Sequence, residues 1–171
     1  FLIGLVVFGR RLARRMDETM IPPRVKISGL YVNSVLAKTD AVLSGYDEAI
    51  LLNQDGSVAE GTGENIFIVR GKELLTPPPF IGVLRGITRQ TVMELAQRQR
   101  LGVREELLTR HDLFNANECF LTGTAAEIVP IVTIDGRTIG SGKPGPVTKK
   151  LQQSFRQLTK TQGMRYSFDS G

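Results

Sequence analysis

Residues 45–69 read GYDEAILLNQDGSVAEGTGENIFIV, and this stretch, with the residues that follow it, decides the fold class. It consists of short apolar runs bounded by glycine, asparagine and aspartate, which predicts strands joined by turns. The predicted strands are 49–52, 57–59, 65–69 and 73–75. The predicted turns are 54–56 (QDG) and 71–72 (GK). We therefore predict a meander of short strands in this part of the chain.

A helix is predicted immediately before this meander, at residues 28–44. Apolar side chains recur there at helical spacing, among them Val32, Val35 and Leu36. Gly45 stands where such a helix would end, because glycine is the residue most often found just past a helix C-terminus.

Two further helices and several strands are predicted along the rest of the chain. Residues 87–100 carry apolar side chains on one helical face and are followed by Gly102. A last helix is predicted to begin near Pro146, because the fixed φ of proline suits a first helical turn. The remaining predicted strands are 1–8, 103–107, 119–122, 128–134 and 137–139. This mixture predicts an α/β fold of the α+β type.

The size and composition predict one soluble domain. The chain has 171 residues, of which 41% are hydrophobic and 23% charged, and no run approaches the roughly 20 apolar residues that span a bilayer. A single cysteine, Cys119, excludes an intrachain disulfide and is compatible with a cytoplasmic location; its apolar surroundings predict a buried side chain. We expect an N-terminal strand and basic connection at 1–21, the main domain at 22–160, and a tail without regular structure at 161–171.

The charge distribution argues against a nucleic acid partner, and no membrane partner is expected. Residues 1–25 hold five arginines against Asp17 and Glu18, a local charge of +3, so the rest of the chain contributes only +2 to the net +5. No segment interleaves basic and aromatic residues as a base-stacking surface would. At the N-terminus the arginines follow the apolar residues, whereas a signal peptide places its charge first, so secretion is not expected. An amphipathic surface segment remains the alternative to a strand at 1–8.

Four segments combine glycine with groups that could carry chemistry. Lys26 precedes Ser28-Gly29, and the segments 60–65 (EGTGEN) and 122–127 (TGTAAE) place polar groups at predicted turns. Segment 84–88 (LRGIT) opens the second helix, where free backbone N–H groups and the helix dipole suit a phosphate. The plain alternatives are ordinary turns and, at 84–88, a simple helix start with Thr88 as its cap.

No metal site is predicted. The lone histidine, His111, has no nearby histidine or cysteine that would complete a metal-binding set. Its position between Arg110 and Asp112 favours an exposed residue at the start of a helix.

These segments together resemble a known family. KISGLYVNSVLAKTDA, the stretch 45–69, TPP, LRGITR, ECFLTGTAAEI and GKPGPVTKKLQ occur in the order and at the spacing of the class IV pyridoxal-phosphate aminotransferases, specifically the branched-chain amino-acid enzymes. The resemblance extends from about Pro22 to Leu158. It implies the large pyridoxal-phosphate-binding domain of the D-amino-acid aminotransferase-like fold, a strand pseudo-barrel with flanking helices.

The resemblance also implies roles for individual residues. Lys26 matches the lysine that forms a Schiff base with pyridoxal 5'-phosphate, and a confined pocket with a nearby cation would help its amine lose a proton. Tyr31 matches the tyrosine that hydrogen-bonds the cofactor's phenolic oxygen. Glu60 matches the carboxylate that faces the pyridine nitrogen and keeps it protonated. Leu84 matches the residue that packs on the ring face.

The remaining roles concern the phosphate, the substrate and the surrounding support. By the same resemblance, the phosphate is bound by Gly86, Ile87, Thr88 and Thr124. Thr124 and Ala125 match the loop that binds the substrate carboxylate. Glu64 and Asn65 are expected to support the residues that touch the cofactor, and their GxGEN pattern is similar to that of the branched-chain group.

The implied activity is transfer of an amino group between leucine, isoleucine or valine and 2-oxoglutarate by a homodimer. Two departures from the family are expected to matter. Leu30 occupies the position where the family has asparagine. The chain is also expected to lack the family's N-terminal small domain, and the uncovered face would be an exposed apolar patch that favours association.

The alternatives to this activity are another class IV enzyme, such as a D-amino-acid aminotransferase or an aminodeoxychorismate lyase, and a truncated domain that does not transaminate.

Overall fold

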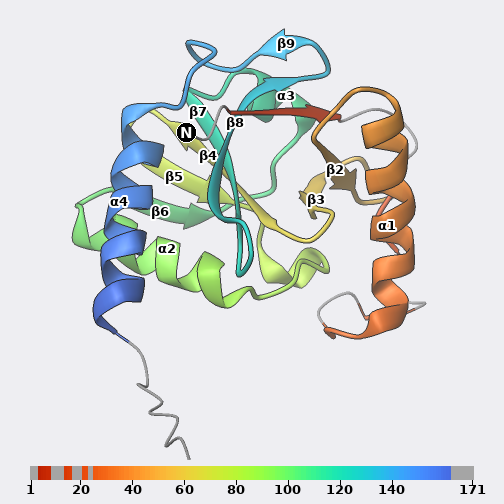
Figure 1. The fold of residues 1–171 in the computed structure, drawn as a ribbon, viewed down its shortest axis with the longest axis horizontal. Helices are drawn as coiled ribbons and strands as arrows, with labels where there is room; N and C mark the ends of the chain where they lie inside the picture. The colour runs from red at the N-terminus through yellow and green to blue at the C-terminus, as the bar shows by residue number, and fades with distance from the viewer. Residues whose placement is uncertain (1–3, 9–13, 17–20, 23–24, 163–171) are drawn as a thin grey trace, which may run out of the picture.

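The computed structural model describes residues 4–8, 14–16, 21–22 and 25–162. Within these ranges nine strands form one curled sheet (Figure 1). The strands are β1 (Leu5–Phe8), β2 (Glu48–Leu52), β3 (Val58–Gly61), β4 (Asn65–Arg70), β5 (Glu73–Thr76), β6 (Gly102–Glu105), β7 (Glu118–Gly123), β8 (Glu127–Ile134) and β9 (Arg137–Thr138). The predicted fold class, a curled strand sheet with flanking helices, is confirmed.

The order of the strands in the sheet differs from their order in the sequence. The path is β3-β2-β1-β8-β7-β4-β5-β6, with β9 paired to β8. The predicted turns do form antiparallel hairpins, β2 with β3 and β4 with β5. However, β1 lies between β2 and β8 and runs parallel to both, so the two hairpins are separated in the sheet. Sequence neighbours β3 and β4 are joined instead at a corner, where Gly61 N donates to Glu64 O at 2.7 Å.

Both faces of the central strands are buried. On β4, Ile66 and Ile68 point into one core cluster, whereas Phe67 and Val69 point into another on the opposite face. Phe67 stacks on Phe120 of β7 with ring centroids 5.2 Å apart. Burial on both faces explains why 65–69 reads as a continuous apolar run rather than as an alternating pattern.

Helices cover the sheet on different sides. They are α1 (Ser28–Leu43), the 3₁₀ helix η1 (Pro79–Ile81), α2 (Ile87–Arg98), α3 (Arg110–Phe114) and α4 (Pro146–Thr161). In Figure 1, α2 and α4 lie against one side of the sheet, and α1 lies apart from them beside β2 and β3. The predicted helices are confirmed. The helices predicted at 28–44 and 87–100 begin at the predicted residues and end within two residues of the predicted ends, and the last helix begins at Pro146. Thr88 is not the cap of α2, because Gly86 occupies the N-cap position and no side chain caps it.

Helix α1 turns its apolar stripe toward solvent. Val32, Val35 and Leu36 are 62%, 60% and 62% exposed, and the side chains that pack inward are small, among them Ala37 and Ala41. The periodicity thus predicted the helix correctly, and its larger apolar side chains form an exposed stripe.

The remaining structural predictions concern single residues and the chain ends. Cys119 is buried, as predicted, and burial raises the pKa of its thiol far above the ordinary value. His111 is exposed in the first turn of α3, as predicted. No helix in the described ranges is long and apolar enough to cross a membrane. Thr161, the first residue of the predicted tail at 161–171, is instead the last residue of α4. Residues 163–171, and most of the predicted N-terminal strand and connection at 1–21, fall outside the described residues.

Candidate functional site

A pocket lies between α1, the β3–β4 corner and the segment that leads into α2. It encloses about 420 Å³ of space, including the part open to solvent. Its lining residues are Arg15, Val25, Lys26, Leu30, Tyr31, Ser34, Glu60, Thr62, Gly63, Glu64, Asn65 and Leu84. Six residues selected from the sequence therefore line one pocket: Lys26, Tyr31, Glu60, Glu64, Asn65 and Leu84. We refer to it below as the Lys26–Glu60 pocket.

Lys26 and Tyr31 come from the start of α1. Lys26 immediately precedes Ile27, the N-cap residue, and Tyr31 follows in the first turn. The Nζ atom of Lys26 lies 5.9 Å from the centroid of the Tyr31 ring. Lys26 is exposed, so the confinement that we expected around its amine is not present among the described residues. Leu30, at the position where asparagine was expected, contributes an apolar side chain to the pocket wall.

Glu60, in the wall of the same pocket, is a buried carboxylate with several donors. It is 6% exposed and lies near the end of β3. Its Oε1 forms an ion pair with Nη1 of Arg15, and its Oε2 accepts hydrogen bonds from Leu84 N and Asn65 Nδ2, each at 3.1 Å. Burial raises the pKa of Glu60 to about 7, although the charge of Arg15 and the Leu84 N–H act to lower it.

Asn65 connects this carboxylate to the segment that begins α2. The same Nδ2 that donates to Glu60 also donates to Leu84 O at 2.8 Å. Its Oδ1 lies so close to Gly86 that a Cβ at that position would overlap it. Gly86 must therefore lack a side chain for α2 to begin beside Asn65. The supporting role expected of Asn65 is consistent with these contacts.

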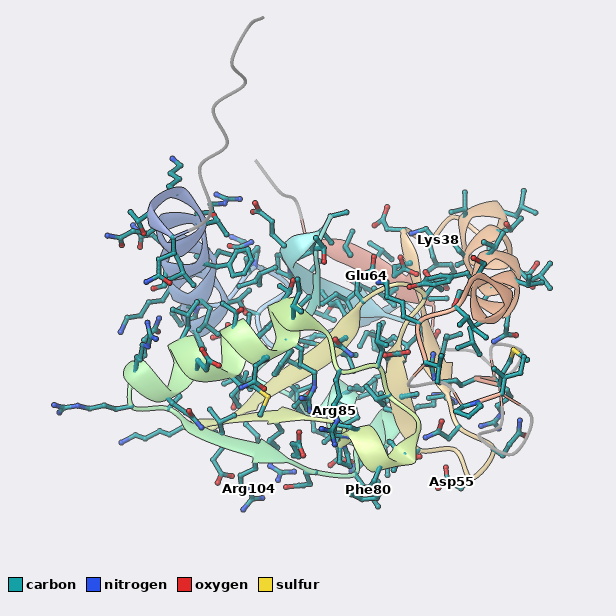
Figure 2. The ribbon with its side chains drawn as sticks, turned by 90° about the horizontal axis from the view of Figure 1, so that it is seen from below. Lys38, Asp55, Glu64, Phe80, Arg85 and Arg104 are labelled. Carbon is teal, nitrogen blue, oxygen red and sulfur yellow. The ribbon has the colours of Figure 1, made fainter. Side chains whose placement is uncertain are left out.

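Glu64 and Glu48 form a second acidic region at the rim of the pocket. Figure 2 shows Glu64 and Lys38 near each other between α1 and the strands, and the charge of Lys38 acts on the Glu64 carboxyl. Buried Glu48 accepts hydrogen bonds from Lys38 Nζ and from Thr62 Oγ1, both at 2.6 Å, so it links α1 to the β3–β4 corner. Burial, followed by the negative charge of Glu48, raises the pKa of Glu64.

The residues expected to bind phosphate do not line the same pocket. Gly86 and Ile87 line a neighbouring hollow with Arg85, which Figure 2 shows close to Phe80 of η1. Thr88 is 5% exposed and buried in the first turn of α2.

Thr124 and Ala125 are exposed on the loop between β7 and β8 and line neither of these two pockets. The loop nevertheless begins next to the Lys26–Glu60 pocket, since a Cβ on Gly123 would lie 3.2 Å from Glu64 Cγ.

Sequence reasoning missed Arg15. It was counted only as one of five arginines in the basic N-terminal segment. In the structure its side chain is 10% exposed, lines the pocket and pairs with Glu60. No periodicity or spacing identifies it, because its partner lies far along the chain. The only available signal was the general rule that a buried carboxylate requires a donor or a cation.

The chain was compared with known protein families, proteins and structures. The family model described as class IV amino-transferase matches residues 9–134. The probable branched-chain-amino-acid aminotransferase of Aquifex aeolicus is 51% identical over 154 residues, which is 90% of this chain and 50% of that protein.

Two solved structures of branched-chain aminotransferases superpose closely on the fold. The enzyme from Thermoproteus uzoniensis, crystallised with norvaline, gives a TM-score of 0.87 at 44% identity, covering 92% of this chain and 52% of that one. The T.th. enzyme in complex with N-(5'-phosphopyridoxyl)-L-glutamate gives a TM-score of 0.87 at 40% sequence identity, and the match covers 91% of this chain and 51% of that one. The chain thus spans about half the length of the relatives it matches. The extent of the family match shows that this chain belongs to the class IV amino-transferases.

Proposed function

We propose that the protein of which this chain forms part transfers amino groups between branched-chain L-amino acids and 2-oxoglutarate. The proposed cofactor is pyridoxal 5'-phosphate, held as a Schiff base on Lys26. The observation that carries the proposal is that an amine and a buried carboxylate, Lys26 and Glu60, line one pocket at family-matching positions. An aromatic aldehyde with a ring nitrogen has complementary groups for both.

The pocket residues fit this cofactor chemically. Pyridoxal phosphate, when bound, supplies a ring that withdraws electrons from the substrate's α-carbon. Glu60 would hold a ring N–H with its carboxylate, and a ring cation would in turn favour ionisation of this buried group, whose pKa is otherwise about 7. Tyr31 would donate to or accept from the phenolic oxygen, and Leu84 would pack on the ring.

Lys26 would have two tasks in the reaction. Its amine would attach the cofactor, and after displacement by the incoming amino acid it would accept the proton from the substrate α-carbon and deliver it to the carbon that was the cofactor's aldehyde carbon. Lys26 lies two residues before the first residue of α1, and its exposed four-carbon side chain could reach both atoms.

Phosphate binding is assigned to the start of α2 and the β7–β8 loop. The first N–H groups of a helix have no intrahelical partners and attract anions. We propose that Gly86, Ile87, Thr88 and Thr124 bind the phosphate. Thr124 and Ala125 are proposed to meet the substrate carboxylate. Glu64 and Asn65 would keep the β3–β4 corner in place; the Asn65 bonds to Glu60 and Leu84 O support this role.

The choice of substrates rests on the relatives. The names of the matched proteins specify branched-chain amino acids, and one solved relative holds a conjugate of the cofactor with glutamate, the amino acid that corresponds to 2-oxoglutarate. We further propose a cytoplasmic homodimer in which 22–160 is the cofactor-binding domain, 1–21 a connection and 161–171 a tail. The exposed apolar face of α1 supports association.

Reductive labelling tests the core of this proposal. The chain is incubated with pyridoxal phosphate, reduced with borohydride, digested and mapped by mass. We expect the phosphopyridoxyl group on the peptide that contains Lys26, and we expect its loss in Lys26→Ala. Lys38→Ala is the control, because Lys38 lies on α1, the helix that follows Lys26, but does not line the pocket. Labelling that is unchanged in Lys26→Ala contradicts the assignment.

A further inference from the structure

We infer that Arg15 is a positioning residue that orients the Glu60 carboxylate at the pocket wall and favours its ionised form. The inference rests on the proposed function, because it assigns Arg15 to the group that would hold the ring nitrogen. It adds a residue from the segment before α1, outside the motifs on which the family resemblance was based.

The segment around Arg15 is tied to two parts of the fold, the end of β2 and helix α1. Arg15 N donates to Leu52 O at 2.8 Å, at the end of β2. Asn33 Nδ2 on α1 donates to Arg14 O at 2.7 Å, and Arg14 Nη1 donates to Asn53 O at 2.7 Å. A segment held by both a helix and a strand delivers its side chain to a defined place.

Contacts with Gly82 and Glu60, both in the described part of the chain, hold the Arg15 side chain. Its Nε donates to Gly82 O at 2.9 Å, and its Nη1 pairs with Glu60 Oε1. The guanidinium is planar and its donors keep a fixed relative geometry, so the bond to Gly82 orients the group that meets Glu60. Lysine could supply the charge but not this fixed orientation.

The contacts of Glu60 leave room for one more donor. An ionised carboxylate offers about four acceptor positions. Among the described residues, three are used by Arg15, Asn65 Nδ2 and Leu84 N, and of these donors only Arg15 carries a charge. The fourth position, to which no described residue donates, would accept the ring N–H.

Other charges around Glu60 do not replace Arg15. The negative charge of Glu64 raises the pKa of Glu60. The positive charge of Arg89 lowers that pKa, but by less than Arg15 or the Leu84 N–H does. Lys26 lines the same pocket, and in the described part of the chain the ion pair of Glu60 is formed with Arg15. Since burial favours the neutral acid, loss of Arg15 would leave a carboxyl group that is protonated at neutral pH and unable to hold a protonated ring nitrogen.

A carboxyl NMR titration of the cofactor-free chain tests the charge role directly. We expect wild-type Glu60 to titrate with a pKa of about 7. Arg15→Gln should raise that pKa by about 1 or more, whereas Arg15→Lys should restore most of the wild-type value. Arg98→Gln is the control, because it removes the same charge from an exposed position on α2 outside the Lys26–Glu60 pocket and should leave the titration unchanged. An equal rise in Arg15→Lys and Arg15→Gln would overturn the charge role assigned to Arg15.

A second measurement needs no variant. In the wild-type chain, the Arg15 side-chain nitrogen resonances should shift with the same midpoint as the Glu60 carboxyl carbon. Resonances that do not respond in this pH range would overturn the inference, even if Arg15→Gln fails to fold.

Cofactor labelling separates the two proposals. A Glu60 titration that depends on Arg15, with no label on Lys26, would remove the proposed function and leave the inference about the pair intact. Label on Lys26, together with a Glu60 titration that does not depend on Arg15, would remove the inference about the pair and leave the proposed function intact.

Discussion

Helices α1 and α2 flank the same pocket region, but they are held in place by different forces. On α2 the apolar residues Val92, Leu95 and Ala96 are buried against the sheet and α4. On α1 the larger apolar residues face solvent, and only Ser34, Ala37 and Ala41 are buried. Two helices with apolar periodicity therefore differ in which side chains meet the core. The spacing of apolar residues identifies a helix, but it does not identify the face that packs.

The polar contacts compensate for part of this difference. Helix α1 is linked to the strands through Lys38 and Glu48 and to the Arg14–Met16 segment through Asn33. Helix α2 makes its strongest attachments through apolar burial, with Asn65 beside its first turn. We expect changes on α2 to act on global stability and changes on α1 to act on local order and association.

The largest effect is expected at Glu60, which lies between the two helices. Its pKa is about 7 in the folded chain, above the ordinary value of 4.5, so the folded state binds its proton more tightly than the unfolded state. Stability from this group is fully present below about pH 4.5 and is lost as the pH rises through 7. The free energy of unfolding of the wild type, relative to that of Glu60→Gln, should fall by about 3 kcal/mol between about pH 4.5 and about pH 8. Denaturant titrations at both pH values measure it, and a constant difference would contradict the prediction.

A matched pair of truncations tests the packing difference between the helices. Val92→Ala removes two fully buried methyl groups from α2 and should lower the free energy of unfolding by about 2 kcal/mol. Val35→Ala makes the same change on α1, where the side chain is 60% exposed, and should change it by less than about 0.5 kcal/mol. Urea unfolding measures the loss of unfolding free energy in each variant. Equal losses in Val92→Ala and Val35→Ala would mean that the outer face of α1 is covered in solution.

The polar anchor of α1 should have a smaller effect. Lys38→Met removes the cation that pairs with buried Glu48; because the lysine side chain is 40% exposed, solvent screens the pair and the cost should be about 1 kcal/mol. Amide hydrogen exchange should accelerate in 28–43 more than in 87–98. Lys150→Met, on the exposed side of α4, is the control and should leave both rates unchanged. Faster exchange spread evenly over the chain would argue against a local anchor.

The smallest effect on stability, and the clearest on association, is expected from the outer face of α1. Leu36 and Leu43 are 62% and 81% exposed, so Leu36→Lys with Leu43→Lys should change the free energy of unfolding by less than about 0.5 kcal/mol. The double variant should shift the chain toward monomer in analytical ultracentrifugation, because it interrupts the apolar surface. Gln97→Lys on the exposed side of α2 is the matched control. A wild-type chain that is already monomeric would contradict the prediction.

Much of the local structure could be predicted from the sequence. The helix predicted at 28–44 is α1, Ser28–Leu43, and the turn at 54–56 joins β2 to β3 as an antiparallel hairpin. These elements depend on periodicity and turn chemistry over a few residues, which are readable in the chain. The grouping of Lys26, Tyr31 and Glu60 around one pocket was likewise expected from the family resemblance, and the structure places them there.

The sequence by itself therefore determined the elements, the turns and the candidate chemical groups. Only the tertiary structure decided that β1 enters the sheet between β2 and β8, that the apolar stripe of α1 faces outward, and that Arg15 meets Glu60. Each of these depends on residues far apart in the chain, such as Leu5 paired with Ile131. Local patterns carry no information about such partners, because the free energy that selects them comes from burial and charge pairing in the assembled fold.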